Sequence, residues 1–429
     1  MGIESSEAEK QHMNMRFNRL FPYLASINAH YRSLGIWFAI GLVITAGFLL
    51  LGNAPPIADE GFHVYQIQLF LNGNYSLSPA ITVPPVYHAI LAAVFKLIGI
   101  DAIIVARFIS FLGSLGCIYA FNLLAKRISP EDSHLRTVQF IFLPIVFPFL
   151  FLIYTDIWAL AALLLSIERA MAQRAWQSSL ALALAVAMRP PNILWGLLIF
   201  AILIGLHRGP PHLDRNCISK HFRAAIPFTL LLGAFSIFLI LNHGVSLGDR
   251  EHQRLAFNIS NVWFYLLVFC GLFWPNCLAS SKILFARITQ KPIPWTAGTS
   301  FVFGFYLLTY HISHQYNQPS LWFYLRNRLL YLTTNFSAIK AITFLPIGAG
   351  AIGFSLYSFK NQTLARILIP LTFLSILPFP VIEQRYYLVP ITLFQLFRKS
   401  TLHEEINTVI FITVSAFLTI GISKQLFFL

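Results

Sequence analysis

The chain has 429 residues, of which 57% are hydrophobic, 15% are aromatic and only 11% are charged. Soluble domains carry roughly 25% charged residues, so the composition excludes an ordinary soluble protein and predicts an integral, multi-pass membrane protein in contact with lipid. The formal net charge of +14 is spread over the segments between apolar runs. This distribution argues against a nucleic-acid partner and favours basic loops retained in the cytosol.

Residues 1–34 mix acidic and basic side chains and lack an apolar core followed by a small-residue cleavage site. They are expected to form a cytosolic segment and not a cleaved signal peptide. Residues 35–429 are expected to form one polytopic domain, because no internal repeat divides them. The four cysteines show no CxxC spacing and no neighbouring histidine at ligand spacing, so neither a disulfide framework nor a metal site is predicted.

Apolar runs along the chain predict an all-α protein with about 11 to 14 transmembrane helices, because only helices satisfy the backbone within a lipid bilayer. The runs lie near residues 35–52, 102–124, 137–155, 157–173, 175–189, 191–206, 224–242, 261–281, 299–316, 341–358, 365–381, 386–398 and 406–427.

Charge placement suggests the orientation of these runs. The basic segments 207–223 and 282–298 are expected to be cytosolic loops. The polar clusters of the chain then fall on the opposite face, provided that residues 86–100 lie along the membrane as an amphipathic helix. Their length of fifteen residues and the presence of Lys96 favour that interpretation. Residues 53–101 would form one long external loop.

Two adjacent carboxylates, Asp59 and Glu60, follow the first apolar run directly. A carboxylate at the membrane surface is a suitable general base for a lipid-carried substrate. Neighbouring side chains on a helix diverge by about 100°, so one of the pair is expected to face the reaction and the other the scaffold. The structural alternative is that Asp59 only caps the helix predicted over 61–71. His63, one turn later, favours a site.

Three other polar clusters interrupt apolar sequence. Arg189 stands between a helix end and two prolines, where it either binds an anion or extends to the interface. Asp249 belongs to a charged cluster, 248–252, that could equally be a solvated turn. Glu383 and Arg385 lie in a short polar segment and could form only an ion pair with each other.

The segment 311–328 combines histidine, hydroxyl, amide and aromatic groups with Arg326 and Arg328. Such mixtures bind sugars, and arginine binds phosphate. An interfacial aromatic belt is the structural alternative.

Together these segments resemble the dolichyl-phosphate-glucose α-1,2-glucosyltransferase family, which belongs to the GT-C superfamily of polytopic glycosyltransferases. The resemblance rests on six ordered blocks that cover most of the chain, at residues 59–66, 78–87, 152–156, 189–195, 242–249 and 383–386. The chain departs from the family pattern at Ser78, at Pro190 and Pro191, and at 317–321. It therefore resembles a divergent member.

The resemblance implies a GT-C fold and transfer of glucose, with inversion, from a dolichyl (polyprenyl) phosphate to a lipid-linked oligosaccharide, without a cofactor or a metal. It implies Asp59 as the catalytic base, with Glu60 as a second catalytic group that orients it or binds the acceptor. The implied substrate-binding residues are His63, Gln66, Asp156, Arg189, Asn192, Asp249, His311, Arg326, Arg328, Glu383, Arg385 and Tyr386.

Two other functions remain open from the sequence. A related GT-C enzyme could use the same kind of donor with mannose or another hexose. A polytopic carrier for an anionic or lipid-linked substrate is the alternative of another class, although carriers often show repeat symmetry. The expected compartment is the endoplasmic reticulum membrane in a eukaryote and the inner membrane in a bacterium.

Overall fold

The computed structural model describes residues 35, 37–206, 215–250, 254–290, 292–318, 327–357, 359–401 and 403–428. Most of these residues are helical, and the extended pairing found among them is one isolated bridge between Phe359 and Arg398. The chain divides into two compact units, Met1–Leu50 and Leu51–Leu429. A helix spans Trp37–Gly52, and the elements below belong to the second unit.

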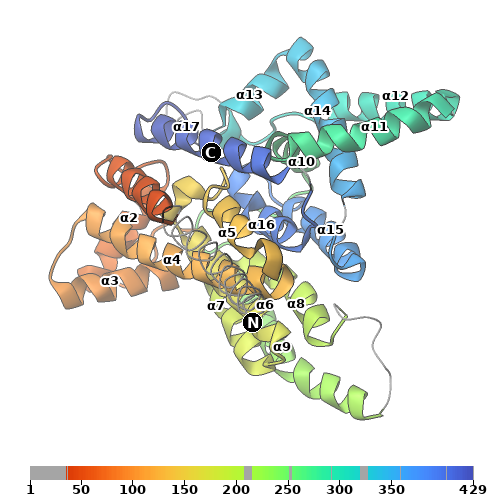
Figure 1. Cartoon of the computed structure of the whole chain (residues 1–429). Coiled ribbons are helices and arrows are strands. Elements are labelled where there is room, and N and C mark those ends of the chain that lie inside the picture. The colour runs from red at the N-terminus through yellow and green to blue at the C-terminus, as the bar shows by residue number, and fades with distance from the viewer. Residues whose placement is uncertain are drawn as a thin grey trace, which may run out of the picture. The chain divides into compact units, whose positions relative to one another are not determined.

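The second unit contains the helices that Figure 1 labels, joined by short 3₁₀ turns. The α-helices are α2 (Glu60–Leu71), α3 (Val86–Ile98), α4 (Ile103–Ile128), α5 (Ser133–Ile141), α6 (Thr155–Met171), α7 (Ala175–Met188), α8 (Gly196–Leu203), α9 (Arg215–Asn242), α10 (Ser260–Leu272), α11 (Trp274–Gln290), α12 (Pro292–Thr309), α13 (Arg328–Asn335), α14 (Ser337–Leu356), α15 (Gln362–Ile376), α16 (Leu388–Phe397) and α17 (Glu404–Ser423). The 3₁₀ turns are η1 (Pro130–Asp132), η2 (Phe147–Leu150), η3 (Pro190–Trp195), η4 (Gln315–Asn317) and η5 (Gln384–Tyr387).

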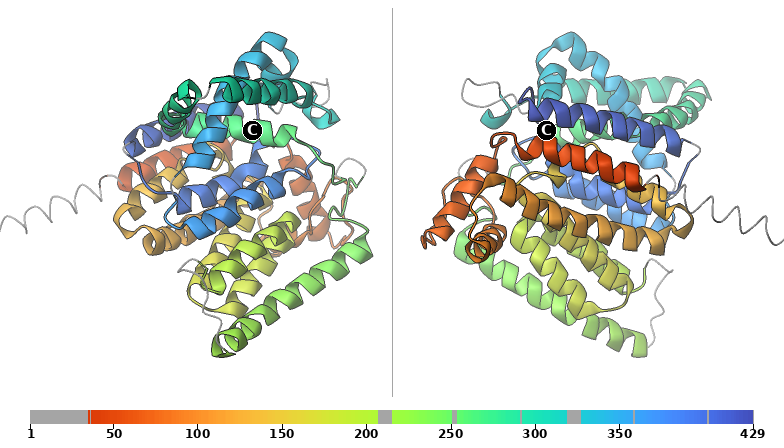
Figure 2. Two further views of the ribbon diagram at one scale, coloured as in Figure 1. Left: turned by 90° about the vertical axis from the view of Figure 1, so that its right-hand side faces the viewer. Right: turned by 60° about the vertical axis from the view of Figure 1, so that its left-hand side comes forward.

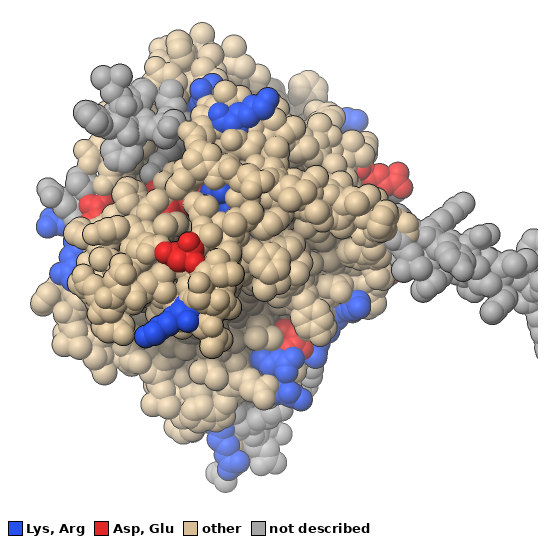
Figure 3. Space-filling model, turned by 90° about the vertical axis from the view of Figure 1, so that its left-hand side faces the viewer, with Lys and Arg blue, Asp and Glu red and all other residues tan. Residues whose placement is uncertain are grey.

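The prediction of an all-helical, membrane-integral chain is confirmed, whereas the predicted number of spans is not. Among the described residues, four helices are long and apolar enough to cross a membrane: Ile103–Ile128, His221–Asn242, Ser337–Leu356 and Glu404–Ser423. A fifth span arises if the bent pair formed by α10 and the start of α11 is counted as one. The surface agrees with this environment, since acidic and basic side chains are few and scattered over the face in Figure 3.

Three details of the predicted topology are wrong, and proline explains two of them. The run 137–155 is not one span, because Pro144 and Pro148 end α5 and confine the following residues to the η2 turn. The run 261–281 bends by 99° between α10 and α11, where Pro275 cannot donate a backbone hydrogen bond. The expected loop 282–298 is largely helical, because α11 extends to Gln290 and α12 begins at Pro292.

The helix predicted over 86–100 is present as α3. It packs against α2, and the two bury an apolar cluster that includes Ile67, Tyr87 and Leu91. Gly99 ends α3 with a φ of +70°, a conformation that favours glycine. Elsewhere in this unit, α4 packs on α6 and α6 on α7, while α10 and α11 pack on α14 (Figure 2). Residues 53–101, which precede α4, thus contain a packed pair of helices.

Candidate active site

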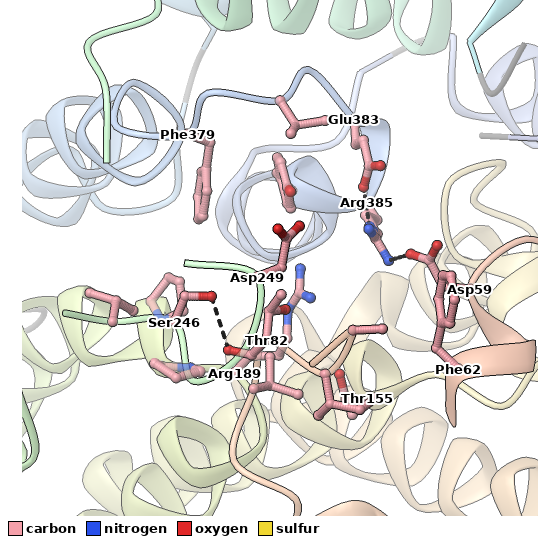
Figure 4. A pocket seen from close by; sticks show the side chains of 18 of the residues that line it. Asp59, Phe62, Thr82, Thr155, Arg189, Ser246, Asp249, Phe379, Glu383 and Arg385 are labelled. Atoms are coloured by element: carbon pink, nitrogen blue, oxygen red, sulfur yellow. Dashed lines mark hydrogen bonds and ion pairs between the residues drawn. The ribbon is translucent and has the colours of Figure 1, made fainter. Parts of the chain in front are cut away.

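A cavity of about 390 Å³ lies where several helices begin or end. Its wall is built from the start of α2, residues 79–83, the start of α6, the η3 turn, residues 245–249 and the η5 turn (Figure 4). This volume lies within the range of small-molecule sites. Its polar lining residues are Asp59, His63, Thr82, Thr155, Arg189, Ser246, Asp249, Tyr316, Glu383, Arg385 and Tyr386.

Asp59 occupies the N-cap position of α2, but its side chain accepts no capping hydrogen bond. Its carboxylate instead lies 3.0 Å from the guanidinium of Arg385. The backbone N–H of Asp59 donates to the hydroxyl of Tyr154 at 3.0 Å. The preceding Ala58 has a φ of +49°, an uncommon conformation for alanine that is often found at functional sites. The geometry therefore directs this carboxylate into the cavity and disfavours the capping alternative.

Two guanidinium groups flank the ring of Tyr386 inside the cavity. The Arg189 guanidinium lies 5.7 Å from the ring centroid and the Arg385 guanidinium lies 5.9 Å from it. Arg189 also pairs with Asp156 at 3.0 Å, and Arg385 pairs with Glu383 as well as with Asp59. These cations are therefore held by carboxylates and an aromatic face and point toward a shared space where an anion can bind.

The charge states of Arg385 and Tyr386 follow from their surroundings. Burial lowers the pKa of Arg385, but the negative charges of Glu383 and Asp59 outweigh burial and raise this pKa well above its ordinary value. Burial and the charge of Glu383 raise the pKa of the Tyr386 hydroxyl. Arg385 thus stays cationic and Tyr386 stays neutral, so the cavity keeps a positively charged group that can face an anion.

Glu60 lies outside the cavity and is fully buried. Its carboxylate pairs with Arg107 of α4 at 2.5 Å and accepts hydrogen bonds from the backbone N–H groups of Ile57 and Ile153, both at 2.8 Å. Arg107 also donates to the carbonyl oxygens of Leu51, Gly52, Ala54 and Pro55. The two adjacent acids diverge as expected. This placement opposes the catalytic part expected for Glu60 and assigns it to the scaffold that fixes the loop before Asp59.

Gln66 is likewise a scaffold residue, contrary to the expected contact with substrate. Its side chain is fully buried, accepts from the backbone N–H of Ser78 at 2.7 Å and donates to the carbonyl oxygen of Ser76. It thereby ties α2 to the segment that carries residues 79–83.

Asn192 and Asp156 line a smaller pocket of about 40 Å³ that shares Arg189, Arg385 and Tyr386 with the main cavity.

The remaining expected residues of 311–328 do not gather at the cavity. His311 is exposed, and its backbone groups bond to the Ser260 hydroxyl. Arg328 is exposed at the start of α13. Arg326 lies outside the described residues. Tyr316, from the same segment, does line the cavity and donates to Asp249 at 2.7 Å.

Residues 247–249 lie against residues 79–82. The backbone N–H groups of Leu247, Gly248 and Asp249 donate to the carbonyl oxygens of Thr82, Ile81 and Pro79 at 3.1, 2.9 and 2.8 Å. A Cβ atom at Gly248 would overlap the carbonyl oxygens of Pro79 and Ile81. Only glycine allows this close approach, which carries Asp249 to the cavity.

We expect Gly248→Ala to destabilise the protein by about 1–3 kcal/mol and to reduce its activity, because the methyl group must push the two segments apart. Thermal unfolding of the purified variant in detergent, together with its catalytic rate, measures this effect. Gly233→Ala is the matched control, since its Cβ meets no atom within 4 Å. Equal thermal stability and equal catalytic rate in the two variants would show that neither stability nor activity depends on the close approach of residues 247–249 to residues 79–82.

Arg107, Tyr154 and Tyr316 contribute to the site but were not among the expected site residues. Arg107 could have been found, because an arginine inside a long apolar run is costly and usually has a specific partner. Tyr154 and Tyr316 carried no such signal, since tyrosine is common at membrane interfaces.

A family model described as the DIE2/ALG10 family matches residues 53–211 and 211–396, which include every segment that lines the cavity. The chain belongs to the DIE2/ALG10 family.

Proteins named Dol-P-Glc:Glc(2)Man(9)GlcNAc(2)-PP-Dol alpha-1,2-glucosyltransferase are similar over most of their length. The Debaryomyces hansenii protein is 25% identical over 408 residues, which cover 85% of this chain and 87% of that protein. The Yarrowia lipolytica protein is 24% identical, with 82% of this chain and 85% of that protein covered. A Homo sapiens protein is 22% identical, with 87% and 90% covered.

Among solved structures, ArnT from Cupriavidus metallidurans bound to undecaprenyl phosphate matches with a TM-score of 0.40 and 15% identity, over 91% of this chain and 76% of that one.

Proposed function

We propose that this protein is a glycosyltransferase that moves glucose from dolichyl-phosphate glucose onto a lipid-linked oligosaccharide through an α-1,2 linkage. Its family supports this function, as do the names of relatives that it matches along more than four fifths of their length. By the same reasoning we place it in the endoplasmic reticulum membrane, with the loop 53–101 and the cavity facing the lumen. An enzyme family accounts for these matches better than a carrier does.

The observation that carries the proposal is that one cavity joins a carboxylate, Asp59, to two guanidinium groups, those of Arg189 and Arg385. Glycosyl transfer from a phosphate carrier needs these two functions. A base must take a proton from the acceptor, and positive charge must stabilise the phosphate that leaves.

The reaction would proceed as a single displacement. The acceptor hydroxyl oxygen attacks the anomeric carbon as Asp59 removes its proton, and a new carbon–oxygen bond forms. The bond between the anomeric carbon and the phosphate oxygen breaks, and its electron pair stays on dolichyl phosphate. Arg385 and Arg189 stabilise that anion. The sugar is inverted, and no covalent intermediate is needed.

The test is transfer by the purified protein in detergent or liposomes. Dolichyl-phosphate glucose and Glc(2)Man(9)GlcNAc(2)-PP-dolichol are expected to give a product with one further glucose that an α-1,2-specific glucosidase removes. Dolichyl-phosphate mannose, tested at equal concentration, is the control for the donor sugar. Transfer of mannose without glucose would establish the alternative GT-C activity, and absence of any transfer would contradict the proposal.

A further inference from the structure

The ring of His63 lies in the wall of the cavity and contacts a second buried histidine. His63 follows Asp59 by one turn of α2 and is only 8% exposed. Its Nδ1 lies 2.8 Å from Nε2 of His88 in α3, and the two rings stack at a centroid distance of 5.0 Å. Tyr154 and Tyr87 pack edge-on against the His63 ring. The pair is therefore rigidly held between the cavity and the core of the external loop.

Both histidines are neutral at physiological pH. Burial lowers the pKa of His63 to about 4, although the charge of Asp59 opposes this shift. Among the other groups around His63, Asp156 also raises its pKa, and Arg385 and Arg189 lower it. Burial and the neighbouring His63 lower the pKa of His88 well below its ordinary value. A neutral imidazole carries one N–H, so each ring has two tautomers.

The hydrogen bond between the two rings allows two arrangements. If Nδ1–H of His63 donates, the proton of His88 lies on its own Nδ1. That atom is buried and has no partner among the described residues. If Nε2–H of His88 donates, the same atom is only an unused lone pair. Orphaned buried N–H groups are rarer in proteins than orphaned acceptors, so the second arrangement is favoured.

In that arrangement the proton of His63 lies on Nε2. This nitrogen has no hydrogen-bond partner within the described part of the chain, and His63 lines the cavity. We propose that His88 is a positioning residue that holds His63 in the tautomer whose Nε2–H donates to an oxygen of the bound donor. In the other tautomer His63 would present a lone pair beside Asp59 and act as a competing proton acceptor. The inference rests on the proposed function and assigns His63 a neutral donor role within it.

The oxygen that accepts this hydrogen bond belongs either to a hydroxyl of the donor sugar or to the donor phosphate. We expect His88→Leu, which removes the donated hydrogen bond, to lower kcat/KM for dolichyl-phosphate glucose about tenfold. His88→Gln keeps an N–H donor at this position and is expected to recover most of the loss. If His88 had a purely structural role, the loss of kcat/KM in each variant would parallel its loss of thermal stability, whether or not the new side chain can donate a hydrogen bond.

Two measurements distinguish the sources of the oxygen. If a sugar hydroxyl accepts the hydrogen bond from His63, the deoxyglucose donor that lacks this hydroxyl has a lower kcat/KM with the wild-type protein. With that donor, His88→Leu then causes no further loss of kcat/KM. If the phosphate accepts the hydrogen bond, removing any one sugar hydroxyl changes kcat/KM by the same factor in the wild type and in His88→Leu. Inhibition by dolichyl phosphate is then about tenfold weaker in His88→Leu. Unchanged kinetics in His88→Leu, or equal losses in His88→Leu and His88→Gln, would overturn the inference.

Nitrogen-15 NMR of histidine-labelled protein tests the tautomer without any substrate. The signals are assigned by comparison with His63→Gln and His88→Gln. A protonated Nε2 and an unprotonated Nδ1 in His63 are expected, and this pattern is expected to be lost in His88→Leu. Protonated Nδ1 in His63 would refute the inference whatever reaction the protein catalyses, so its failure is separable from failure of the proposed function.

Discussion

Asp59→Asn is expected to lower kcat for glucose transfer by about 10²- to 10⁴-fold, the usual contribution of a general base. Asparagine has nearly the same shape but cannot accept the proton of the acceptor hydroxyl. Its amide oxygen can still accept a hydrogen bond from Arg385, which lies 3.0 Å from the present carboxylate. The KM for the donor should therefore change much less than kcat. Steady-state kinetics of purified protein in liposomes provides both constants.

The control for this experiment is Asp101→Asn. Asp101 lies in the same segment between Trp37–Gly52 and α4 and accepts a hydrogen bond from Gln68 at 2.6 Å, but it is exposed and does not line the cavity. Its kinetics are expected to match the wild type. A large rise in KM for Asp59→Asn with an unchanged kcat would show instead that Asp59 only orients Arg385. A variant that folds normally and transfers glucose at the full rate would exclude Asp59 from the reaction.

Arg107→Met is expected to destabilise the protein by about 3–5 kcal/mol, because it leaves the carboxylate of Glu60 buried without its cation. Both side chains are fully buried in the structure. The carbonyl oxygens of Ala54 and Pro55 lose their donors in the same step. Since these residues lead directly to Asp59, the activity of the surviving folded protein should also fall. Thermal unfolding in detergent and the transfer rate report the two effects separately.

The double variant Arg107→Met with Glu60→Gln distinguishes the two consequences. Removing both charges should restore much of the stability, because no unpaired ion remains buried. Activity should stay low, since the loop before Asp59 still lacks its hydrogen-bond donor. Arg127→Met serves as the control, because the Arg127 side chain is 43% exposed and its buried partner Glu168 keeps a second cation, Arg169, so its loss should cost only about 1 kcal/mol. Full recovery of activity in the double variant would contradict a positioning role for Arg107.

The sequence identified residues that the structure brings together in one cavity, but it did not give the number of spans. Asp59, Arg189, Asp249 and Arg385 stood out because each interrupts apolar sequence, where an ionised side chain is costly without a partner. Their convergence on one cavity followed from charge counting, which put them on one face. The choice between Asp59 and Glu60 could not be made in this way. It depends on Arg107, which approaches Glu60 from another helix.

Span counting failed for a different physical reason. Hydropathy measures how apolar a run is, but it does not show whether the run forms one continuous helix with a single axis. The runs 137–155 and 261–281 are predominantly apolar, yet prolines divide the first and the chain bends by 99° within the second. Pro144, Pro148 and Pro275 mark these breaks in the sequence, because proline ends or redirects a helix without making the run less apolar. The contact between residues 247–249 and 79–82 is likewise a tertiary feature that no local pattern contains.

The segments that form the cavity also have a consequence for biogenesis. Asp59 and Arg189 come from the first of the two matched regions, whereas Asp249, Glu383 and Arg385 come from the second. Helices of a membrane protein enter the bilayer in the order of their synthesis, so Asp59 is in place long before its partner Arg385 has been translated. The ribosome must have passed η5 before the pocket can close. A chain that terminates before η5 therefore lacks Arg385 and Tyr386 and cannot form the complete pocket.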